Sequence, residues 1–439
     1  MKLYIKDAID KYSKRNPIRL HMPGHKSRDY GCLCEDVTEL PVIDNEKAVR
    51  LAERDIKDIL KVKASFILTN GSTSGIFAMI SAVKGFGDKI IVNRFAHKSV
   101  FNALSLFNIE PVFVADKIID GLPSLPTEEE ISLAIENNPT VIGAILTYPD
   151  YYGRAFDIEK IKIALKKKNK LLLVDGAHGA HFFITNPDKY AGKFADIYVD
   201  GAHKTLPTLT QGAILSVTDI DLIDKVKSSL DLLLTTSPSY PILSSVEYGV
   251  KYLYKYGAKQ YLLQQKYLKR IKDKLSAEKI GFLQLSDGLK LTVDFLNSGI
   301  PVKKAISVLE KNGVYAETYD SRYVLFMFSV LNKKEDYDAL YNAIKEITQL
   351  KRQKIKSGFY FDGKRERKVS FNKVGEYDFE CVDAENAKGR ISAVNFGIFP
   401  PCYPLVVAGE VITEKDIEII KNAENTFGTL NGKIKVVKL

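Results

Sequence analysis

Two short apolar segments in the first half of the chain are each followed by a reactive, ionisable residue. Residues 171–174 read Leu-Leu-Leu-Val and lead directly into Asp175. Residues 197–199 form a second apolar segment, and Lys204 follows it in the loop after His203. Runs of this length predict buried strands, so an aspartate and a lysine are expected at two strand ends. A lysine in a loop is normally a solvated surface residue, and only the surrounding motifs give the pair a meaning.

Strand and helix patterns alternate between residues 46 and 217. Strands are predicted at 65–68, 89–92, 111–115, 141–147, 171–175, near 200 and at 212–217, and helices at 46–60, from 75 to 83, at 99–107 and at 158–167. Repeated strand–helix units of this length indicate an α/β fold with a largely parallel sheet and helices on both faces. Ligands of such a sheet bind at the carboxyl ends of its strands, where Asp175 and Lys204 are expected.

Changes in pattern divide the chain into four expected parts. Residues 1–45 lack periodicity and predict an N-terminal arm, and residues 46–240 predict the large α/β domain. Residues 241–350 hold a long helical region followed by short strands and helices, which predicts a helical linker and a small α+β domain. Residues 351–439 begin with a basic run, predicted to be a solvated connector, and end in a C-terminal subdomain.

Composition excludes several classes of protein. Of the 439 residues 45% are hydrophobic and 27% are charged, which is ordinary for a soluble globular chain. No apolar run reaches the ~18 residues that span a bilayer, and the N-terminus lacks a signal-peptide core, so a cytoplasmic location is expected. The net charge of +10 is spread among interleaved acids and no nucleic-acid motif accompanies it. The lone Cys32-x-Cys34 pair has no partner pair at metal-ligand spacing, so no metal site is predicted.

The six histidines, at positions 21, 25, 97, 178, 181 and 203, all lie in the first half of the chain. This distribution indicates a site assembled there. His97 follows a predicted strand, where its ring can lie over a planar cofactor; the alternative is a helix-capping or solvent-facing histidine. Residues 70–75, Asn-Gly-Ser-Thr-Ser-Gly, follow a strand and open a helix. Their amides and hydroxyls suit a phosphate, although an ordinary Ser/Thr cap has the same pattern.

Together these residues predict a site for pyridoxal phosphate (PLP). The lysine would form the Schiff base with the cofactor, and Asp175 would keep the pyridine nitrogen protonated so that the ring accepts electrons.

Further motifs then occur in a fixed order along the chain. They are HMPGHK at 21–26, DVTEL at 36–40, NGST at 70–73, HKS at 97–99, DGAHGAHF at 175–182, HKTLP at 203–207 with Gln211, SPSYP at 237–241 and PPCYP at 400–404 with Gly409 and Glu410. As an ordered set they resemble the bacterial ornithine/lysine/arginine decarboxylase family of fold-type I PLP enzymes. The resemblance runs from about residue 20 to residue 415. The short N-terminus resembles the compact branch, which lacks the wing domain of the long inducible enzymes.

The resemblance implies a role for each matching residue. Lys204 would carry the Schiff base, Asp175 would pair with the pyridine nitrogen, His97 and Ala177 would cover the two ring faces, His178 would lie near the phenolic oxygen, and Ser72, Thr73 and His203 would hold the phosphate. Thr236 and Ser237 would reach the phosphate of the neighbouring subunit, since such enzymes are dimers or larger with the site at the interface. The acids expected as partners of a substrate's distal cation are Glu39, Asp44 and Asp150, with ordinary surface acids as the alternative.

The implied reaction is decarboxylation of lysine, arginine or ornithine to a di- or polyamine and CO2. Five residues depart from the family pattern: Gly176, Gly201, Asp150 and the adjacent Cys402 and Tyr403. Two alternatives stay open. One is another PLP reaction, such as transamination or elimination, for which Arg322 and Arg390 are available as partners of a substrate carboxylate. The other is a non-catalytic dimer of the same fold.

Overall fold

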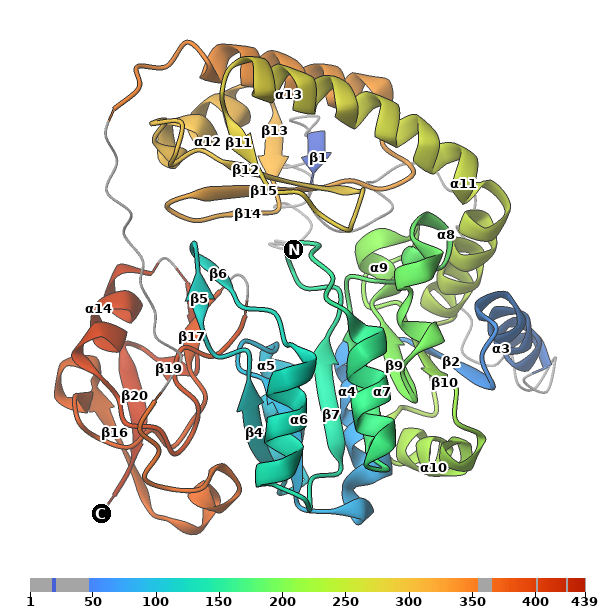
Figure 1. Ribbon diagram of the computed structural model, residues 1–439, viewed down its shortest axis with the longest axis vertical. Helices are drawn as coiled ribbons and strands as arrows, with labels where there is room; N and C mark the ends of the chain where they lie inside the picture. The colour runs from blue at the N-terminus through green and yellow to red at the C-terminus, as the bar shows by residue number, and fades with distance from the viewer. Residues whose placement is uncertain (1–17, 21–46, 354–364, 400–401, 424, 439) are drawn as a thin grey trace, which may run out of the picture.

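The computed structural model describes residues 18–20, 47–353, 365–399, 402–423 and 425–438. Most of the expected N-terminal arm lies outside these residues, and with it Cys32, Cys34, Glu39 and Asp44. Figure 1 shows a large sheet flanked by helices below, a smaller sheet under two long helices above, and the C-terminal segments at one side. In the described part of the chain no helix is both long and apolar enough to cross a membrane.

The large sheet confirms the expected α/β fold. Its seven strands are ordered β2 (Ala64–Leu68), β10 (Ala213–Val217), β9 (Ile197–Asp200), β8 (Leu171–Gly176), β7 (Gly143–Thr147), β3 (Lys89–Asn93) and β4 (Glu110–Val114). β10 is antiparallel to both of its neighbours, and the pairs from β9 through β4 are parallel. Their carboxyl ends therefore meet along one edge of the sheet.

Helices cover both faces of this sheet, which explains why its strands are apolar on both sides. The helices α6 (Glu128–Asn137) and α7 (Ile158–Lys167) lie on one face, and α4 (Gly71–Val83), α5 (Lys98–Leu106) and α10 (Ile223–Leu233) lie on the other (Figure 1). Gly75 brings α4 close to the strands, since a Cβ there would lie 2.4 Å from a methyl group of Val199. This close approach fixes the start of α4 at the edge where β8 and β9 end.

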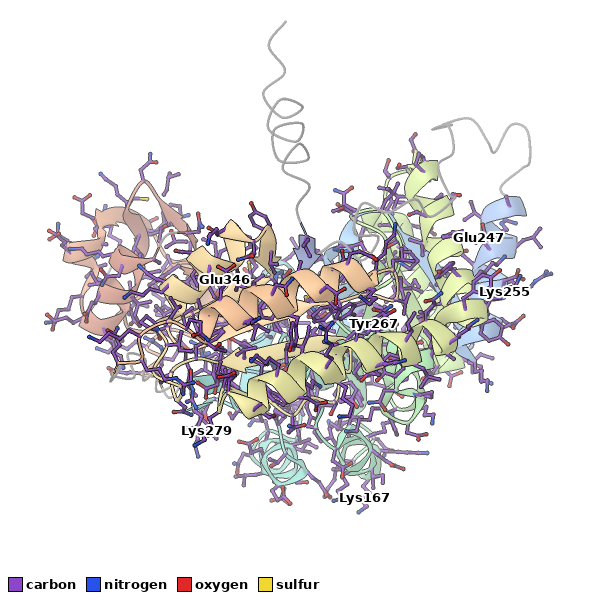
Figure 2. All side chains as sticks on the ribbon, turned by 90° about the horizontal axis from the view of Figure 1, so that it is seen from above. Lys167, Glu247, Lys255, Tyr267, Lys279 and Glu346 are labelled. Carbon is purple, nitrogen blue, oxygen red and sulfur yellow. The ribbon has the colours of Figure 1, made fainter. Side chains whose placement is uncertain are left out.

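The helix α11 (Tyr240–Ala277) connects the large sheet to a small one. The small sheet is antiparallel, in the order β11 (Gly281–Phe282), β12 (Lys290–Asp294), β15 (Tyr323–Met327) and β14 (Thr318–Tyr319). Beside it lie α12 (Val302–Lys311), α13 (Lys334–Ile347) and the parallel pair β1 (Ile18–Leu20) and β13 (Val314–Ala316). Figure 2 shows α11 and α13 side by side, with Tyr267 on the first and Glu346 on the second. One apolar core runs from these helices into the face of the large sheet.

The remaining helices and strands are α3 (Lys47–Leu60), before the large sheet, and elements that are short or lie near the C-terminus. The latter are β5 (Ile118–Ile119), β6 (Leu122–Pro123), α8 (Phe182–Thr185), α9 (Ala202–Thr205), β16 (Phe379–Asp383), β17 (Gly397–Ile398), α14 (Glu414–Asn422), β18 (Thr426–Phe427), β19 (Thr429–Leu430) and β20 (Lys433–Val437).

Ion pairs attach the C-terminal segments to the large sheet and to one another. The guanidinium of Arg94 is fully buried and donates to Glu410 at 2.9 Å and to the carbonyl of Pro404 at 3.0 Å. Arg365 binds Asp416 through two hydrogen bonds and is only 7% exposed, and Arg367 binds Glu110 at 2.6 Å. The prediction of a solvated connector is therefore wrong for the end of the basic run, because its arginines have carboxylate partners in the folded core.

Candidate active site

A cavity of about 340 Å³ opens at the carboxyl edge of the large sheet. Its walls include residues that follow β2, β3, β7, β8 and β9, which is where a parallel sheet places a ligand. The lining residues used below are Ser72, Thr73, His97, Thr147, Asp150, Tyr151, Tyr152, Asp175, Ala177, His178, His203, Lys204 and Tyr403. The cavity thus brings together the predicted cofactor residues, apart from Thr236 and Ser237.

Lys204 lies on α9, directly after β9, and its amine reaches into this cavity. Its Nζ is 3.2 Å from Nε2 of His178. Burial lowers the pKa of Lys204, and the negative charge of Asp175 acts in the opposite direction. A lysine whose pKa is lowered in this way has more of its amine in the neutral, nucleophilic form.

Asp175 stands near the end of β8 with only 1% of its surface exposed. Its Oδ1 accepts a hydrogen bond from the amide of Ala177 at 3.2 Å. Burial raises the pKa of Asp175, while the positive charge of Lys204 opposes that shift. A buried carboxylate gains stability from a protonated partner, so a ligand nitrogen that carries a proton suits this wall of the cavity.

His97 caps a helix and also lines the cavity, so the two readings of the sequence are compatible. As the N-cap of α5 its Nδ1 accepts from the amide of Ser99 at 3.2 Å and lies 2.7 Å from the Ser99 hydroxyl. Burial, and next the charge of Lys204, lower the pKa of His97 to about 3. His203 donates from Nδ1 to the carbonyl of Gly212 at 2.9 Å, and burial lowers its pKa to about 4. Both rings are therefore neutral near pH 7.

These two histidines predict a loss of stability in acid. The unfolded chain binds protons at a pKa near 6.5, whereas the folded protein binds them at about 3 for His97 and about 4 for His203. Between pH 6.5 and pH 4 the unfolded state holds more protons, so stability falls as the pH falls. Each histidine contributes up to about 1.4 kcal/mol per pH unit once the unfolded chain is fully protonated, so the two together contribute about 3 kcal/mol from pH 6.5 to pH 5. Urea unfolding at both pH values measures this; a His97→Asn/His203→Asn variant with the same pH dependence as the parent would contradict it.

The start of α4 offers the cavity an anion-binding end. Ser72 and Thr73 stand in its first turn, and Gly71 has a φ of +70°. The amide of Gly71 donates to the carbonyl of Gln211 at 2.7 Å. The N-cap residue Asn70 makes no side-chain capping bond, so the next backbone N–H groups, those of Ser72 and Thr73, stay available to a ligand. Such groups, with the positive end of the helix dipole, bind phosphate.

Two buried polar atoms in the same cavity add to this set. Nδ1 of His178 and Oγ1 of Thr147 have no hydrogen-bond partner among the residues that the structure describes. Buried polar atoms are normally satisfied, which indicates that a ligand supplies their partners. The cavity thus combines an amine, a buried carboxylate, an anion-binding end and unsatisfied polar groups. These residues fit PLP, whose aldehyde, ring nitrogen and phosphate require such groups.

Several predicted residues do not contribute to this cavity. Thr236 and Ser237 are exposed and do not line it, so their contact with a neighbouring subunit stays a prediction. Asp150 lines the cavity, but Arg154 donates to its carboxylate from Nε at 2.7 Å. The negative charge of Asp150 is therefore already balanced within the chain, which weakens it as the partner of a substrate cation.

The arginines considered for transamination are bound elsewhere. Arg322 pairs with Asp294 at 2.9 Å, and Arg390 pairs with Glu380 at 2.6 Å. Neither arginine lines the cavity. The structure therefore gives no support to the idea that either one binds a substrate carboxylate.

The departures at Gly176 and Gly201 follow from close packing. A Cβ at Gly176 would lie 2.6 Å from Oδ1 of Asp200, and one at Gly201 would lie 2.5 Å from the carbonyl oxygen of Ala177. Restoring the family's larger residues at these positions would push apart the end of β8, which carries Asp175, and the start of α9, which carries Lys204.

We expect Gly201→Ser to destabilise the protein by about 1–3 kcal/mol and to weaken PLP binding, although it adds a hydroxyl near the phosphate end. Denaturant unfolding and PLP titration measure both effects. Gly85→Ser is the matched control, because a Cβ at Gly85 meets nothing within 4 Å. Tighter PLP binding by Gly201→Ser would show that the missing hydroxyl, and not the packing, limits this site.

Three tyrosines of the cavity had no predicted role. The ring of Tyr151 meets the ring of His178 edge-on at 5.1 Å, and its hydroxyl donates to Glu317 at 3.0 Å. A signal for Tyr151 and Tyr152 was present, since both follow a predicted strand that ends at the same edge as Asp175. Tyr403 had no such signal, because it reaches the cavity only through the buried anchor at Arg94.

The chain was compared with protein families, and the model described as "Orn/Lys/Arg decarboxylase, major domain" matches residues 32–292, which is more than half of the chain. The chain belongs to the Orn/Lys/Arg decarboxylase family. The motif resemblance predicted this family, and the match confirms it.

Similar proteins extend the likeness over nearly the whole chain. The uncharacterized protein YaaO of Bacillus subtilis is 29% identical, with 98% of this chain and 96% of that protein covered. The arginine decarboxylase of Halalkalibacterium halodurans is 26% identical over 93% of this chain and 91% of its own length. The solved constitutive lysine decarboxylase of Escherichia coli superposes with a TM-score of 0.75 at 18% identity, covering 92% of this chain and 75% of that one. The fold is that of fold-type I PLP enzymes, as predicted, and the family is one of amino acid decarboxylases.

Proposed function

We propose that the protein uses PLP to decarboxylate a basic amino acid. The observation that carries this proposal is the meeting of Lys204, His178 and Asp175 in one cavity, with the amine 3.2 Å from the imidazole and the carboxylate buried. Membership of the Orn/Lys/Arg decarboxylase family supports it. The names of the similar enzymes, arginine decarboxylase and lysine decarboxylase, support a basic substrate.

PLP, when bound, supplies the electron sink that accepts the bonding pair left behind by departing CO2. The protein's residues bind and orient the cofactor and supply the proton that the product requires. The first turn of α4, with Ser72 and Thr73, would hold the phosphate, and Asp175 would keep a proton on the ring nitrogen. His97, fixed by Ser99, would cover one ring face.

Lys204 holds the cofactor and, with His178, controls a proton. Their nitrogens are within hydrogen-bond distance, and burial lowers both pKa values. The pair therefore keeps one proton close to the site where the carboxylate leaves. The proton delivered to the α-carbon replaces CO2, so that the product is the amine.

The carboxylate of Glu317 supports a cationic substrate, because it accepts a hydrogen bond from the cavity-lining Tyr151 at 3.0 Å and its negative charge acts on Lys204. Glu39 and Asp44, outside the described residues, and Asp150 remain proposed partners of the distal cation.

We also propose a homodimer or larger assembly, with Thr236 and Ser237 reaching the partner's site, that works in the cytoplasm in polyamine synthesis. The exposure of these two residues, beside the 72% exposed Leu232, supports the shared site.

Product identification tests the proposed reaction class. The PLP-loaded protein is offered lysine, arginine and ornithine in one mixture, and mass spectrometry follows the products. We expect one of the corresponding amines, cadaverine, agmatine or putrescine, to accumulate. A keto acid without an amine would show that the protein is an aminotransferase on this fold, and no turnover with PLP bound would favour the non-catalytic alternative.

A further inference from the structure

Three ionisable residues outside the cavity are buried against one another: His181, Asp287 and Lys290, here called the buried triad. Their side chains are 0%, 0% and 1% exposed. Nε2 of His181 lies 2.8 Å from Oδ1 of Asp287, and Nζ of Lys290 lies 3.9 Å from its Oδ2. None of the three lines the cavity, and the proposed reaction uses none of them.

Such a cluster is a costly way to fill a core. Burying charged groups carries a desolvation penalty that their mutual attraction only partly offsets, and apolar residues of the same volume often do better. In addition, Nδ1 of His181 and Oδ2 of Asp287 have no hydrogen-bond partner in the described part of the chain. This cost indicates that the triad has a role in the segments of the chain that it joins.

The buried triad joins the small sheet to two walls of the cavity. Lys290 begins β12, and its Nζ donates to the carbonyl of Tyr151 at 2.8 Å. His181 closes the loop after β8 that carries His178. Asp287 also donates its amide to the carbonyl of Gly153 at 2.9 Å. Gly153 must be glycine here, since its φ is +92° and a Cβ would lie 2.8 Å from the Cβ of Asp287.

The two walls meet at the rings of Tyr151 and His178. These rings are in edge-on contact at 5.1 Å, with an angle of 85° between their planes. The far side of the His178 ring carries Nε2, 3.2 Å from Nζ of Lys204. A continuous path of contacts thus runs from Lys290 through Tyr151 and His178 to the reactive amine.

We propose that the buried triad is a positioning device, in which Lys290 at the start of β12 and Asp287 in the loop before it hold Tyr151 against His178 and thereby set the His178 ring at Lys204. Lys290 is a positioning residue, since it touches Tyr151 and not the reacting atoms. The catalytic consequence rests on the proposed function, whereas the placement of the His178 ring does not.

The charge of Lys290 adds an electrostatic effect on the same ring. Burial, then Lys204, then Lys290 lower the pKa of His178. The other ionisable groups that face this ring are His97, His203 and Tyr151. Removing the Lys290 charge should therefore raise the pKa of His178 and leave the remaining groups as they are.

Histidine NMR on the Lys290→Met variant tests the proposal. Methionine keeps an apolar stem of similar length but has neither the charge nor the donor to Tyr151. The chain has only six histidines, so a ring-labelled sample with His178→Gln as the assignment variant isolates the signal of His178. We expect this signal to move and to titrate at a higher pH than in the parent. We also expect kcat to fall at least about tenfold with little change in KM. Lys274→Met, which removes the remote Lys274–Glu278 pair, is the matched control.

A second variant separates positioning from folding. Lys290→Met alone leaves Asp287 buried beside His181, and the protein is expected to melt at a lower temperature. Asp287→Asn/Lys290→Met removes both charges, so it should recover part of that loss while its His178 signal stays displaced. A His178 signal at the parent position in both variants, with only the melting temperature lowered, would reduce the triad to a structural role. This reading holds even if the parent releases no CO2, so failure of the proposed function and failure of this inference are distinguishable.

Discussion

Replacing Lys204 with alanine is expected to lower decarboxylation of every basic amino acid by at least about 10³-fold. The variant removes the amine that lies 3.2 Å from His178 and opposite Asp175. Without it PLP has no covalent attachment, and the proton shared with His178 is lost. Borohydride reduction followed by peptide mapping should find PLP on the Lys204 peptide of the parent and on no peptide of the variant.

The control for this variant is Lys269→Ala, on the exposed face of α11, where the side chain is 74% exposed and pairs with its neighbour Asp273. This control should keep parental activity and parental PLP attachment. If Lys204→Ala kept parental turnover, or if reduction fixed PLP on another lysine, the assignment of the reactive amine would be wrong.

Asp175→Asn is expected to give the second largest effect, a fall in kcat of about 10²–10⁴-fold. The amide has nearly the shape of the carboxylate, so the hydrogen bond from Ala177 can persist. It has no negative charge, however, and cannot hold a proton on the ring nitrogen. The measurement is kcat with saturating PLP, together with the PLP dissociation constant, which should rise.

A matched control lies one strand away. Asp200 on β9 is also only 1% exposed, but it accepts a hydrogen bond from Tyr190 at 2.8 Å and does not line the cavity. Asp200→Asn should therefore reduce kcat far less than Asp175→Asn. Equal losses for the two variants would indicate a general effect of buried charge and not a specific role for Asp175.

The sequence predicted which residues would meet at the carboxyl edge of the sheet, because local signals and tertiary position coincide there. Asp175 and Lys204 follow apolar strands of a parallel sheet, and the carboxyl ends of such strands must meet at one edge. His97 and the turn at Ser72 follow strands of the same sheet. Four strand ends therefore converge without any knowledge of long-range contacts.

Residues that depend on long-range packing escaped prediction. Tyr403 enters the cavity because Arg94, more than 300 positions earlier, binds Glu410 and the carbonyl of Pro404, the residue that follows Tyr403. Arg365 was taken for part of a solvated run, yet it pairs with Asp416 in the core. Local composition does not reveal which carboxylate a buried arginine pairs with. It also does not reveal the free-energy cost of burying the arginine without that partner.

Two helices of the large domain, α6 and α10, were not predicted, and a local signal was present for α6. No element was predicted at α6, whose surface is mostly polar and which buries Ile131, Ala134 and Ile135. Thr127 and Glu130 form a capping box at its start, and this Thr-x-x-Glu spacing is a helix-start pattern in its own right.

Release of labelled CO2 from carboxyl-labelled lysine, arginine and ornithine, each offered separately to the PLP-loaded protein, is the most direct test of the central claim. The geometry around Lys204, Asp175 and His178 predicts release from at least one of the three and none from the Lys204→Ala protein. Absence of release from all three, while PLP is bound covalently at Lys204, would contradict the assignment of a basic amino acid decarboxylase.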